Sequence, residues 1–221
     1  MQRDRLKQTL LTRLKRARNR GHFDRETIYS VIDSTPMCHL GYMVDDQPAV
    51  IPTIQWREGD HIYWHGSRLS RALINAEQQK VCLTVTQFDG MVLARSAFHH
   101  SANYRCAMIF GQPERVEDKD QKTAHLKTML DGLFPDRWDS LRPMTRKELN
   151  ATTVLRLPIE EGAAKIREGD PNDAPEELGL PIWAGVIPLE TRVGKPIPSE
   201  DLQAGIPVPK HVKKYQFTHK R

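Results

Sequence analysis

The stretch IYWHGSRLSR (62–71) joins three strand-forming residues to a polar run that suits a bound anion. The polar run contains, in order, His65, Gly66, Ser67, Ser70 and Arg71. A glycine lets a ligand approach the backbone, hydroxyls near a helix start can donate to an anion, and a guanidinium binds phosphate with paired hydrogen bonds. The stretch therefore predicts a phosphate cradle. The alternative is that Ser67 only caps a helix and that the arginines are solvated.

Two further stretches could contact the ring or chain of a ligand. Residues 93–111 place a polar group between two apolar strand runs, and its members include Ser101, Asn103, Tyr104 and Arg105. In LPIWAGVIPL (180–189), Trp183 lies near a glycine and could stack on a flat ring. The alternatives are a hydrogen-bonded turn for the first stretch, and an apolar barrel plug or a dimer contact for the second.

Metal-dependent and nucleophilic chemistry are poorly supported by the sequence. His99 and His100 are adjacent, but consecutive strand residues point to opposite faces and no Cys or carboxylate is close. No GxSxG elbow, GxGxxG turn or Walker motif is present, and none of the three cysteines lies in an activating context. We therefore expect no metal site, no nucleophile and no Rossmann or P-loop nucleotide site.

Length and composition indicate one folded domain with extensions. The chain has 221 residues, of which 38% are hydrophobic and 28% charged, and its net charge is +5. This length allows a sizeable core. Three cysteines without a CxxC pair and without a secretory signal predict reduced thiols in a cytoplasmic protein. No apolar run approaches the length of a membrane span.

The first fifteen residues form a basic arm. Leu6, Leu10 and Leu14 recur every four residues, which predicts a basic helix with a thin apolar stripe. We expect this helix to dock on its own domain. Binding to nucleic acid or to an anionic membrane surface is the disfavoured alternative, because runs of charge alone are weak evidence. The last residues, 191–221, predict an extended Pro-rich basic tail.

Strand patterns dominate the middle of the chain. Short turns rich in Asp, Gly and Pro separate the β-rich runs, which favours an antiparallel meander and a small barrel over a parallel sheet. The strong turn dipeptide Asp89-Gly90 predicts a tight hairpin. The expected strands are 37–44, 49–56, 61–66, 80–88, 91–98, 104–116 and 153–168, the last broken near Pro158; the expected helices are 24–34, 67–79, 118–133 and 145–150.

Several of these stretches together resemble the pyridoxamine-phosphate-oxidase-like FMN-binding split-barrel family, and within it the group related to nitroimidazole reductase. The resemblance covers residues 16–190. It is carried by GHFDRETIYSVID, CHLGYMVDDQPAVIPT, IYWHGSRLSR, VCLTVTQFDGMVLARSAFHHSANYRCAMIFG, AAKIREG and LPIWAGVIPL, in that order. It implies an α+β, mainly β fold, namely a six-stranded antiparallel split β-barrel (Greek key) with flanking helices.

The resemblance also implies a cofactor, an assembly and a site. The implied cofactor is FMN, with FAD as the second choice, and it would lie at the interface of a homodimer. Ser67, Ser70 and Arg71 would hold its phosphate. The remaining implied contacts are Pro52 and Thr53 along the ring, His65 and Gly66 beside it, Ser101, Asn103, Tyr104 and Arg105 from the adjoining strand, and Trp183 as a cover.

Fold and cofactor do not determine the reaction. The leading hypothesis is an FMN-dependent oxidoreductase that acts on a small aromatic or heteroaromatic molecule, with NADH or NADPH as candidate electron donor. One alternative is oxidation of pyridoxamine or pyridoxine phosphate. The other is a non-catalytic flavin or haem carrier or redox sensor.

Overall fold

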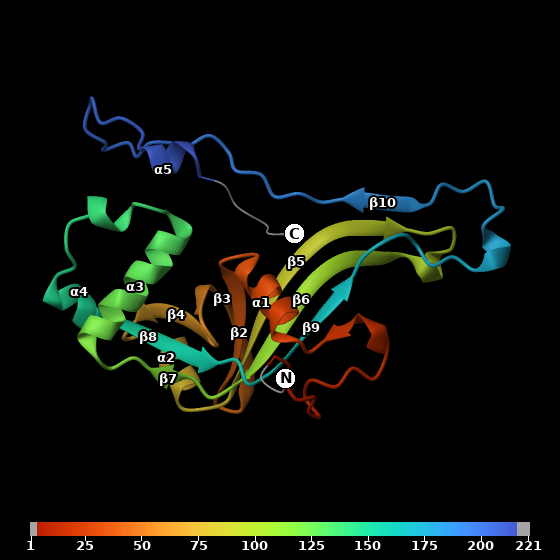
Figure 1. Cartoon of the computed structure of the whole chain (residues 1–221), viewed down its shortest axis with the longest axis horizontal. Coiled ribbons are helices and arrows are strands. Elements are labelled where there is room, and N and C mark those ends of the chain that lie inside the picture. Colours follow the sequence, from red (N-terminus) through yellow and green to blue (C-terminus); the bar gives the residue numbers. More distant parts are fainter. Residues whose placement is uncertain (1–3, 216–221) are drawn as a thin grey trace.

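The computed structural model describes residues 4–215, and its centre is an antiparallel sheet that curls into a barrel (Figure 1). The strands are β1 (Gly21–His22), β2 (Met37–Val44), β3 (Gln47–Glu58), β4 (His61–Ser67), β5 (Val81–Leu93), β6 (Ser101–Gly111), β7 (Glu114–Arg115), β8 (Thr152–Pro158), β9 (Glu161–Arg167) and β10 (Gly185–Pro188). The helices are α1 (Arg25–Asp33), α2 (Arg71–Glu77), α3 (Lys119–Leu133), α4 (Arg146–Ala151) and α5 (Lys210–Lys213). The expected antiparallel, mainly β class is confirmed.

The sheet is split where two consecutive strands part. Its order is β1-β9-β6-β5-β2-β3-β4-β8-β7, with β10 added to the edge of β5. Strands β8 and β9 follow one another in the chain, yet β8 pairs with β4 and β7 while β9 pairs with β6 and β1. The described residues therefore form ten strands rather than the expected six, although β1 and β7 have two residues each.

Local sequence explains the first hairpin and the helix before it. Asp24 caps α1 by accepting a hydrogen bond from the Thr27 amide at 2.8 Å, as its position predicts. Asp45 and Asp46 form the turn between β2 and β3 with φ angles of 47° and 60°. A two-residue turn with both φ angles positive matches the right-handed twist of the strands that it joins. Strand β2 alternates between buried and more exposed residues, and most of β3 alternates between exposed and half-buried ones.

The interior of the barrel is filled by α1 and by the inward faces of the strands. Ile28 and Ile32 of α1 are fully buried against Leu40, Trp64 and Leu155. Burial of large side chains stabilises the fold, because each removes apolar area from water. This core supports the inner faces of β3 and β4, and the outer faces of these strands carry part of the candidate site.

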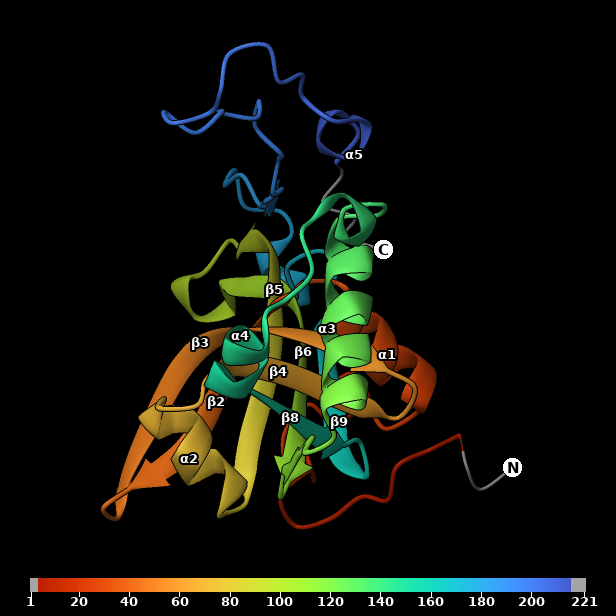
Figure 2. The ribbon, with the colours of Figure 1, turned by 90° about the vertical axis from the view of Figure 1, so that its left-hand side faces the viewer.

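A second, smaller core lies outside the barrel. Helices α3 and α4 cover the outer side of β3 and β4 (Figure 2). Leu126 and Met129 of α3 pack there against Trp56, Tyr63 and Val154. Both helices were predicted from the sequence. Thr145 and Glu148 form a capping box at the start of α4.

The hairpin of β5 and β6 is longer than expected, and the predicted turn at Asp89-Gly90 is wrong. Strand β5 continues through both residues to Leu93, with a register shift between Phe88 and Gly90. The Asp89 carboxylate accepts hydrogen bonds from Arg105 on β6, which holds it inside the ladder. A Cβ at Gly90 would lie 2.8 Å from the Ile187 carbonyl oxygen, so this glycine admits β10 to the sheet edge.

The N-terminal segment also differs from the expectation, because its described part contains no α-helix. It is an extended segment that joins the domain: the Leu6 amide donates to the Phe23 carbonyl at 2.7 Å, and Leu6 enters the barrel core. Leu10, the next leucine of the expected stripe, is 92% exposed. The division at residue 15 stays a prediction.

Two other sequence-based details are corrected. Helix α2 is shorter than the expected 67–79. The apolar residues of that range, Leu69, Leu73 and Ile74, were expected to face inward, but only Leu73 is buried, whereas Leu69 is 82% and Ile74 40% exposed. The apolar block at 182–189 is not a barrel plug, because most of it lies exposed along the edge of β5.

Residues 189–209, here named the C-terminal strap, run back over the molecule from β10 to α5 (Figure 1). Every one of these residues is exposed. No helix in residues 4–215 is both long and apolar enough to cross a membrane.

Candidate functional site

The expected phosphate cradle lies at the end of β4, where the chain turns into α2. The Ser70 amide donates to the Ser67 carbonyl at 2.9 Å, and the Ser67 hydroxyl accepts from the Leu69 amide at 3.2 Å. Ser70 is the N-cap of α2 but makes no side-chain cap bond, so its hydroxyl can serve a ligand. Arg71 is the first helical residue and is exposed.

Gly66 has a structural role that the sequence did not reveal. A Cβ at this position would lie 3.2 Å from a methyl carbon of Leu73 in α2. The glycine therefore allows α2 to pack against the strand end. The expected approach of a ligand to its backbone stays a prediction.

The expected ring contacts on β3 do not share a face. Pro52 and Ile54 are exposed on the outer side of the barrel, whereas Thr53 alternates to the other side. His65 and Ser67 face outward on β4, opposite to the buried Trp64. One outer patch thus includes Pro52, Ile54, His65 and Ser67.

The residues expected on β6 are tied to their own hairpin. Arg105 donates to Asp89 at 2.9 and 2.7 Å, which fixes its guanidinium within the ladder. Asn103 is buried, and its side chain accepts from Arg167 while donating to the Gly169 carbonyl at 3.2 Å. Ser101 and Tyr104 are half-buried, and Lys165 lies over the Tyr104 ring at 5.7 Å.

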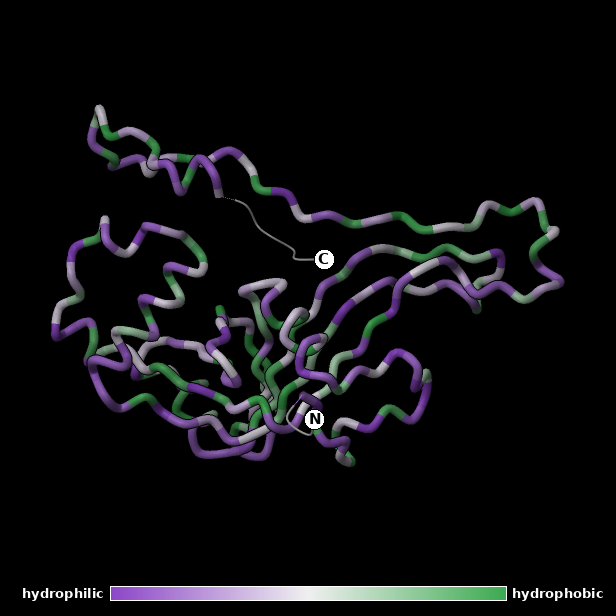
Figure 3. The backbone as a smooth tube through the Cα atoms, in the orientation of Figure 1, coloured by the Kyte–Doolittle hydropathy of each residue, from purple (hydrophilic) through white to green (hydrophobic). Residues whose placement is uncertain are grey.

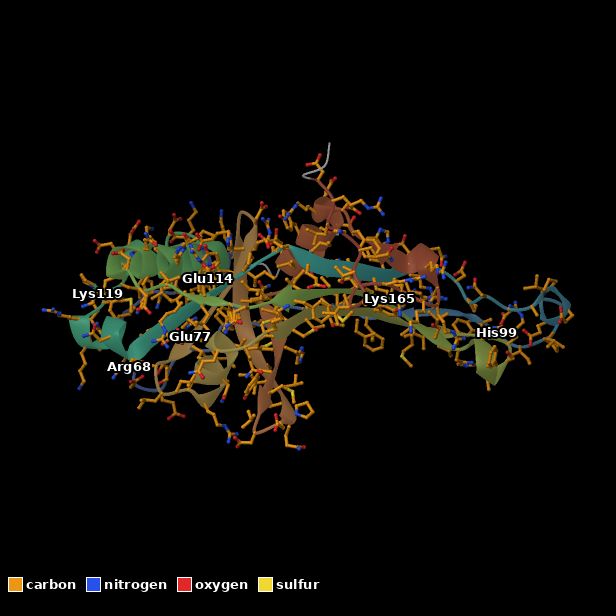
Figure 4. The ribbon with its side chains drawn as sticks, turned by 90° about the horizontal axis from the view of Figure 1, so that it is seen from below. Arg68, Glu77, His99, Glu114, Lys119 and Lys165 are labelled. Carbon is orange, nitrogen blue, oxygen red and sulfur yellow. The ribbon has the colours of Figure 1, made fainter. Side chains whose placement is uncertain are left out.

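Within one chain, the structure does not bring the two groups of expected site residues together. Arg68, beside the cradle, and His99, at the tip of the β5–β6 hairpin, lie at opposite ends of the molecule (Figure 4). Strands β5 and β2 separate β6 from β3 in the sheet. Trp183 belongs to the hairpin end, just before β10, and is 66% exposed.

A cavity that the sequence analysis missed lies beside His65, between β4 and the α3–α4 pair. Its volume is about 550 Å³. Its apolar lining comprises Leu126, Met129, Leu130, Trp138, Leu141, Met144 and Leu149. These residues come from a segment more than fifty positions after His65, so only their apolar periodicity was visible in the sequence.

His65 lines this cavity, and one nitrogen of its ring lacks a hydrogen-bond partner. Its Nδ1 atom is buried and has no hydrogen-bond partner among the described residues. Burial lowers the pKa of His65, which favours the neutral imidazole, the form that binds metal ions. A buried polar atom without a partner is costly unless a ligand, an ion or water satisfies it.

A ring cluster continues from His65 along the outer side of the sheet. Trp56 lies 6.0 Å from His65 and stacks on Tyr63 at 5.6 Å, measured between ring centroids. Glu58 accepts from the Trp56 indole at 2.7 Å and lies 3.0 Å from His125 Nδ1. This cluster lies beside His65, and its other members are not among the residues that line the cavity. No group of three or more His, Cys, Asp or Glu side chains suited to a metal ion occurs in residues 4–215.

Comparison with known families decides the classification. A family model described as pyridoxamine 5'-phosphate oxidase matches residues 24–166. The chain belongs to the pyridoxamine 5'-phosphate oxidase family. The resemblance seen in the sequence is thereby confirmed, and the family is a flavin-binding one.

Several solved structures resemble this chain in sequence and in fold. The flavocytochrome Anf3 from Azotobacter vinelandii is 40% identical, with a TM-score of 0.91 over 94% of this chain and 97% of that chain. An FAD and haem binding protein from Mycobacterium smegmatis is 36% identical, with a TM-score of 0.84 over 89% of this chain and 97% of that one. A candidate 5-nitroimidazole antibiotic resistance protein from Bacteroides thetaiotaomicron is 20% identical, covers 65% of this chain and 84% of its own, and shares the fold with a TM-score of 0.55. No curated protein matches the sequence.

Proposed function

We propose that this protein is a redox protein that binds a flavin and a haem. The observation that carries the proposal is the position of His65, an outward-facing histidine that lines an apolar cavity and whose buried Nδ1 has no hydrogen-bond partner among the described residues. The names of the two relatives that share 40% and 36% of this sequence support it, since one is a flavocytochrome and the other binds FAD and haem.

The cavity fits a haem better than it fits a charged substrate. A haem is a flat, largely apolar group whose iron takes a histidine nitrogen, and the lining offers leucine, methionine and tryptophan side chains around one imidazole. The one arginine at the cavity, Arg142, already pairs with Glu148. This lining disfavours pyridoxamine phosphate as a substrate here, because its phosphate requires free cationic groups.

The flavin in this proposal lies on the outer patch that includes Pro52 and Ser67. Ser67, Ser70 and Arg71 bind its phosphate, as the sequence analysis expected. FAD is placed ahead of FMN because a 36% identical protein, covered over 97% of its chain, is named for FAD. His65 then stands between the flavin patch and the haem cavity, as a ligand on the cavity side.

The proposal requires a homodimer. The expected contacts Ser101, Asn103, Tyr104 and Arg105 lie on β6 and Trp183 lies just before β10, and β5 and β2 separate β6 from the strands that carry the cradle of the same chain. A second copy related by two-fold symmetry can present this end to the cradle.

A flavin accepts two electrons and a haem iron one, so the bound pair would link a two-electron donor such as NADH or NADPH to a one-electron acceptor. In this chain the residues supply binding and exclusion of water. The apolar lining would disfavour water in the cavity, and the Trp56–Glu58–His125 contacts lie beside His65 on the outer side of the sheet. Action on a small aromatic molecule, the leading hypothesis from the sequence, stays a prediction.

The decisive test is a spectroscopic comparison of two histidine variants. The purified protein is titrated with haemin, and its oxidised and reduced absorbance spectra are recorded. The flavin is then released by heat and identified by mass. We expect the wild type to bind one haem per chain, His65→Ala to lose it, and His61→Ala, on the same face of the same strand, to keep it.

Two outcomes would overturn the haem assignment. One is an absence of haem binding by the wild type. The other is a His65→Ala variant that retains haem with an unchanged reduced spectrum. If His65→Ala keeps haem but loses flavin, His65 contacts the flavin, as the sequence analysis expected, and does not bind the haem iron.

A further inference from the structure

A second cavity, here named the α1–α3 cavity, lies where the end of α1 meets α3 and the last part of β3. Its volume is about 260 Å³, and its lining includes Ile32 of α1, Gln55 of β3 and Leu133 of α3. It is distinct from the cavity beside His65, because only Met129 among the described residues lines both. The flavin and haem assignments above do not use it.

The amide of Gln55 is fixed in one orientation at this cavity. The residue is only 3% exposed, and its Nε2 atom donates to the carbonyl oxygens of Ile32 and Thr35, both at 2.8 Å. The amide cannot be turned over, because its oxygen would then face two acceptors. Its Oε1 atom is buried and has no hydrogen-bond partner among the described residues. Such an acceptor is costly to leave unpaired, so the site favours a ligand that donates a hydrogen bond.

The two charged side chains that line the cavity neutralise one another. Arg57 donates from Nε and Nη2 to the carboxylate of Asp33 at 2.9 and 2.5 Å, and from Nη1 to the Gly59 carbonyl at 2.8 Å. Its guanidinium also lies over the Tyr29 ring, 4.3 Å from the centroid. The described lining therefore offers no unpaired cation to a phosphate or carboxylate, and a neutral ligand fits it better than an anion.

Much of the remaining lining is apolar or aromatic, and it includes Trp56, Leu133 and Tyr215. The hydroxyls of Ser34 and Thr128 also belong to it, but each donates to a carbonyl oxygen about one turn earlier in the chain. An apolar cavity of about 150 Å³ can hold benzene, so a cavity of about 260 Å³ has room for a ring with a substituent.

Gly132, in the last turn of α3, lines the cavity as well. Glycine destabilises a helix relative to alanine, so its presence calls for a reason. A Cβ at this position would meet no atom within 4 Å outside its own helix, so packing among the described residues does not require a glycine. Figure 3 shows hydrophobic and hydrophilic residues mixed along α3, as in a helix that packs on one side. The space beside Gly132 is thus available to a ligand.

We propose that the α1–α3 cavity binds a small, planar, neutral molecule, namely an aromatic or heteroaromatic amide or amine whose N–H group donates to Gln55 Oε1. The ring of the ligand contacts the apolar and aromatic lining, and its N–H group satisfies the unpaired acceptor. This inference goes beyond the proposed cofactors and does not depend on them. It assigns a binding site and no reaction.

The first test compares two ligands on the purified protein with its cofactors in place. Nicotinamide is a neutral heteroaromatic amide, and N,N-dimethylnicotinamide is the matched compound without an N–H group. We expect ligand-observed NMR titrations to give a dissociation constant of about 1 mM or lower for nicotinamide. The dimethyl compound should bind at least about fivefold more weakly, because it leaves Oε1 without a donor. In Gln55→Met this ratio should fall to about one, since the acceptor is gone.

A second pair of variants leaves Gln55 in place, because Gln55→Met also removes the donor to the Ile32 and Thr35 carbonyls and so destabilises the fold. Gly132→Leu fills the open space of the cavity and should weaken nicotinamide binding by roughly tenfold or more. Ala124→Leu is the control, since Ala124 is exposed on the same helix and lines neither cavity; it should bind nicotinamide as the wild type does. Circular dichroism checks that each variant is folded.

Three outcomes would overturn the proposal. The first is an absence of saturable binding by the wild type for both nicotinamide and benzamide. The second is equal affinity of the wild type for nicotinamide and its dimethyl derivative. The third is a folded Gly132→Leu variant that binds nicotinamide as tightly as Ala124→Leu does. None of these outcomes bears on the haem and flavin assignments, which are tested by absorbance and by mass.

Discussion

Replacing Arg71 by alanine should weaken flavin binding far more than replacing Arg68. Both arginines follow the end of β4 and are exposed, and neither side chain forms an ion pair within 4.0 Å in the described part of the chain. Neither substitution therefore removes an ion pair from the folded protein. A difference in flavin affinity between the two variants then reports on contacts with the flavin. Only Arg71 stands at the start of α2, beside the free Ser70 hydroxyl.

The size of the effect follows from the exposure of the site. A hydrogen bond to a charged group contributes about 1.5–3 kcal/mol, and an exposed guanidinium belongs at the lower end of that range. A loss of about 1.5–2 kcal/mol raises the flavin dissociation constant by roughly 10- to 30-fold. Arg68 is expected to attract the phosphate only at a distance, and salt screens such an attraction. Its removal should therefore change the flavin dissociation constant by less than about threefold.

The assay is quenching of flavin fluorescence on titration of each apoprotein, at low and at moderate salt. The Arg71→Ala defect should persist at moderate salt, since a direct contact is screened less than a distant charge. Equal losses for the two variants would refute the positional argument and would leave only a diffuse positive field at the strand end. A larger loss for Arg68→Ala would place the phosphate on the other side of Ser67.

Three further predictions concern stability and reactivity. Leu6→Ala should lower the free energy of unfolding by about 2–3 kcal/mol in a urea titration, whereas Leu10→Ala should have no measurable effect because Leu10 is 92% exposed; equal effects would show that the N-terminal segment does not belong to the core. Hydrogen bonds from Arg142 and Thr145 lower the pKa of Glu148 to about 2 from a usual value of 4.5, so the stability that it contributes is complete above pH 4.5 and disappears as the pH falls through 2. The difference in melting temperature between wild type and Glu148→Gln should shrink over that interval, and a constant difference would contradict the assignment. Burial raises the pKa of Cys38 to about 12, so iodoacetamide should leave Cys38 unmodified in the folded protein at pH 8 and modify it after denaturation, as judged by peptide mass; rapid labelling of the native thiol would refute its burial.

Local sequence predicted those features whose causes are local. The Asp24 cap with its apolar spacing specifies α1, and the two aspartates at 45 and 46 specify a tight turn. Asp89-Gly90 carries an equally strong turn signal, but distant residues override it, since Arg105 pairs with the aspartate and β10 packs over the glycine. The leucine spacing of the N-terminal arm failed for a similar reason, because Leu6 gains more from the barrel core than from a helix.

The candidate site was predictable only in part. The polar residues after Trp64 were visible in the sequence, and the structure places Ser67, Ser70 and Arg71 together at one strand end. The cavity beside His65 was not visible, because α3 and α4 belong to a later segment whose docking position depends on tertiary packing. The sequence also did not reveal that the hairpin residues lie far from the cradle. A family resemblance names the residues that contact a ligand, but it does not say whether they come from the same chain or from two chains.

The existence of a separate core under α3 and α4 has a kinetic consequence. Trp56, Tyr63, Leu126 and Met129 pack among themselves, apart from the cluster that fills the barrel. A region with its own core can open at a cost below that of global unfolding, because the opening breaks only its own contacts. A large planar ligand would then enter at the rate of this opening, and its uptake would become independent of ligand concentration once the ligand is abundant. Amide protons of α3 in the ligand-free protein should exchange with solvent well before those of β5, and loading should slow them.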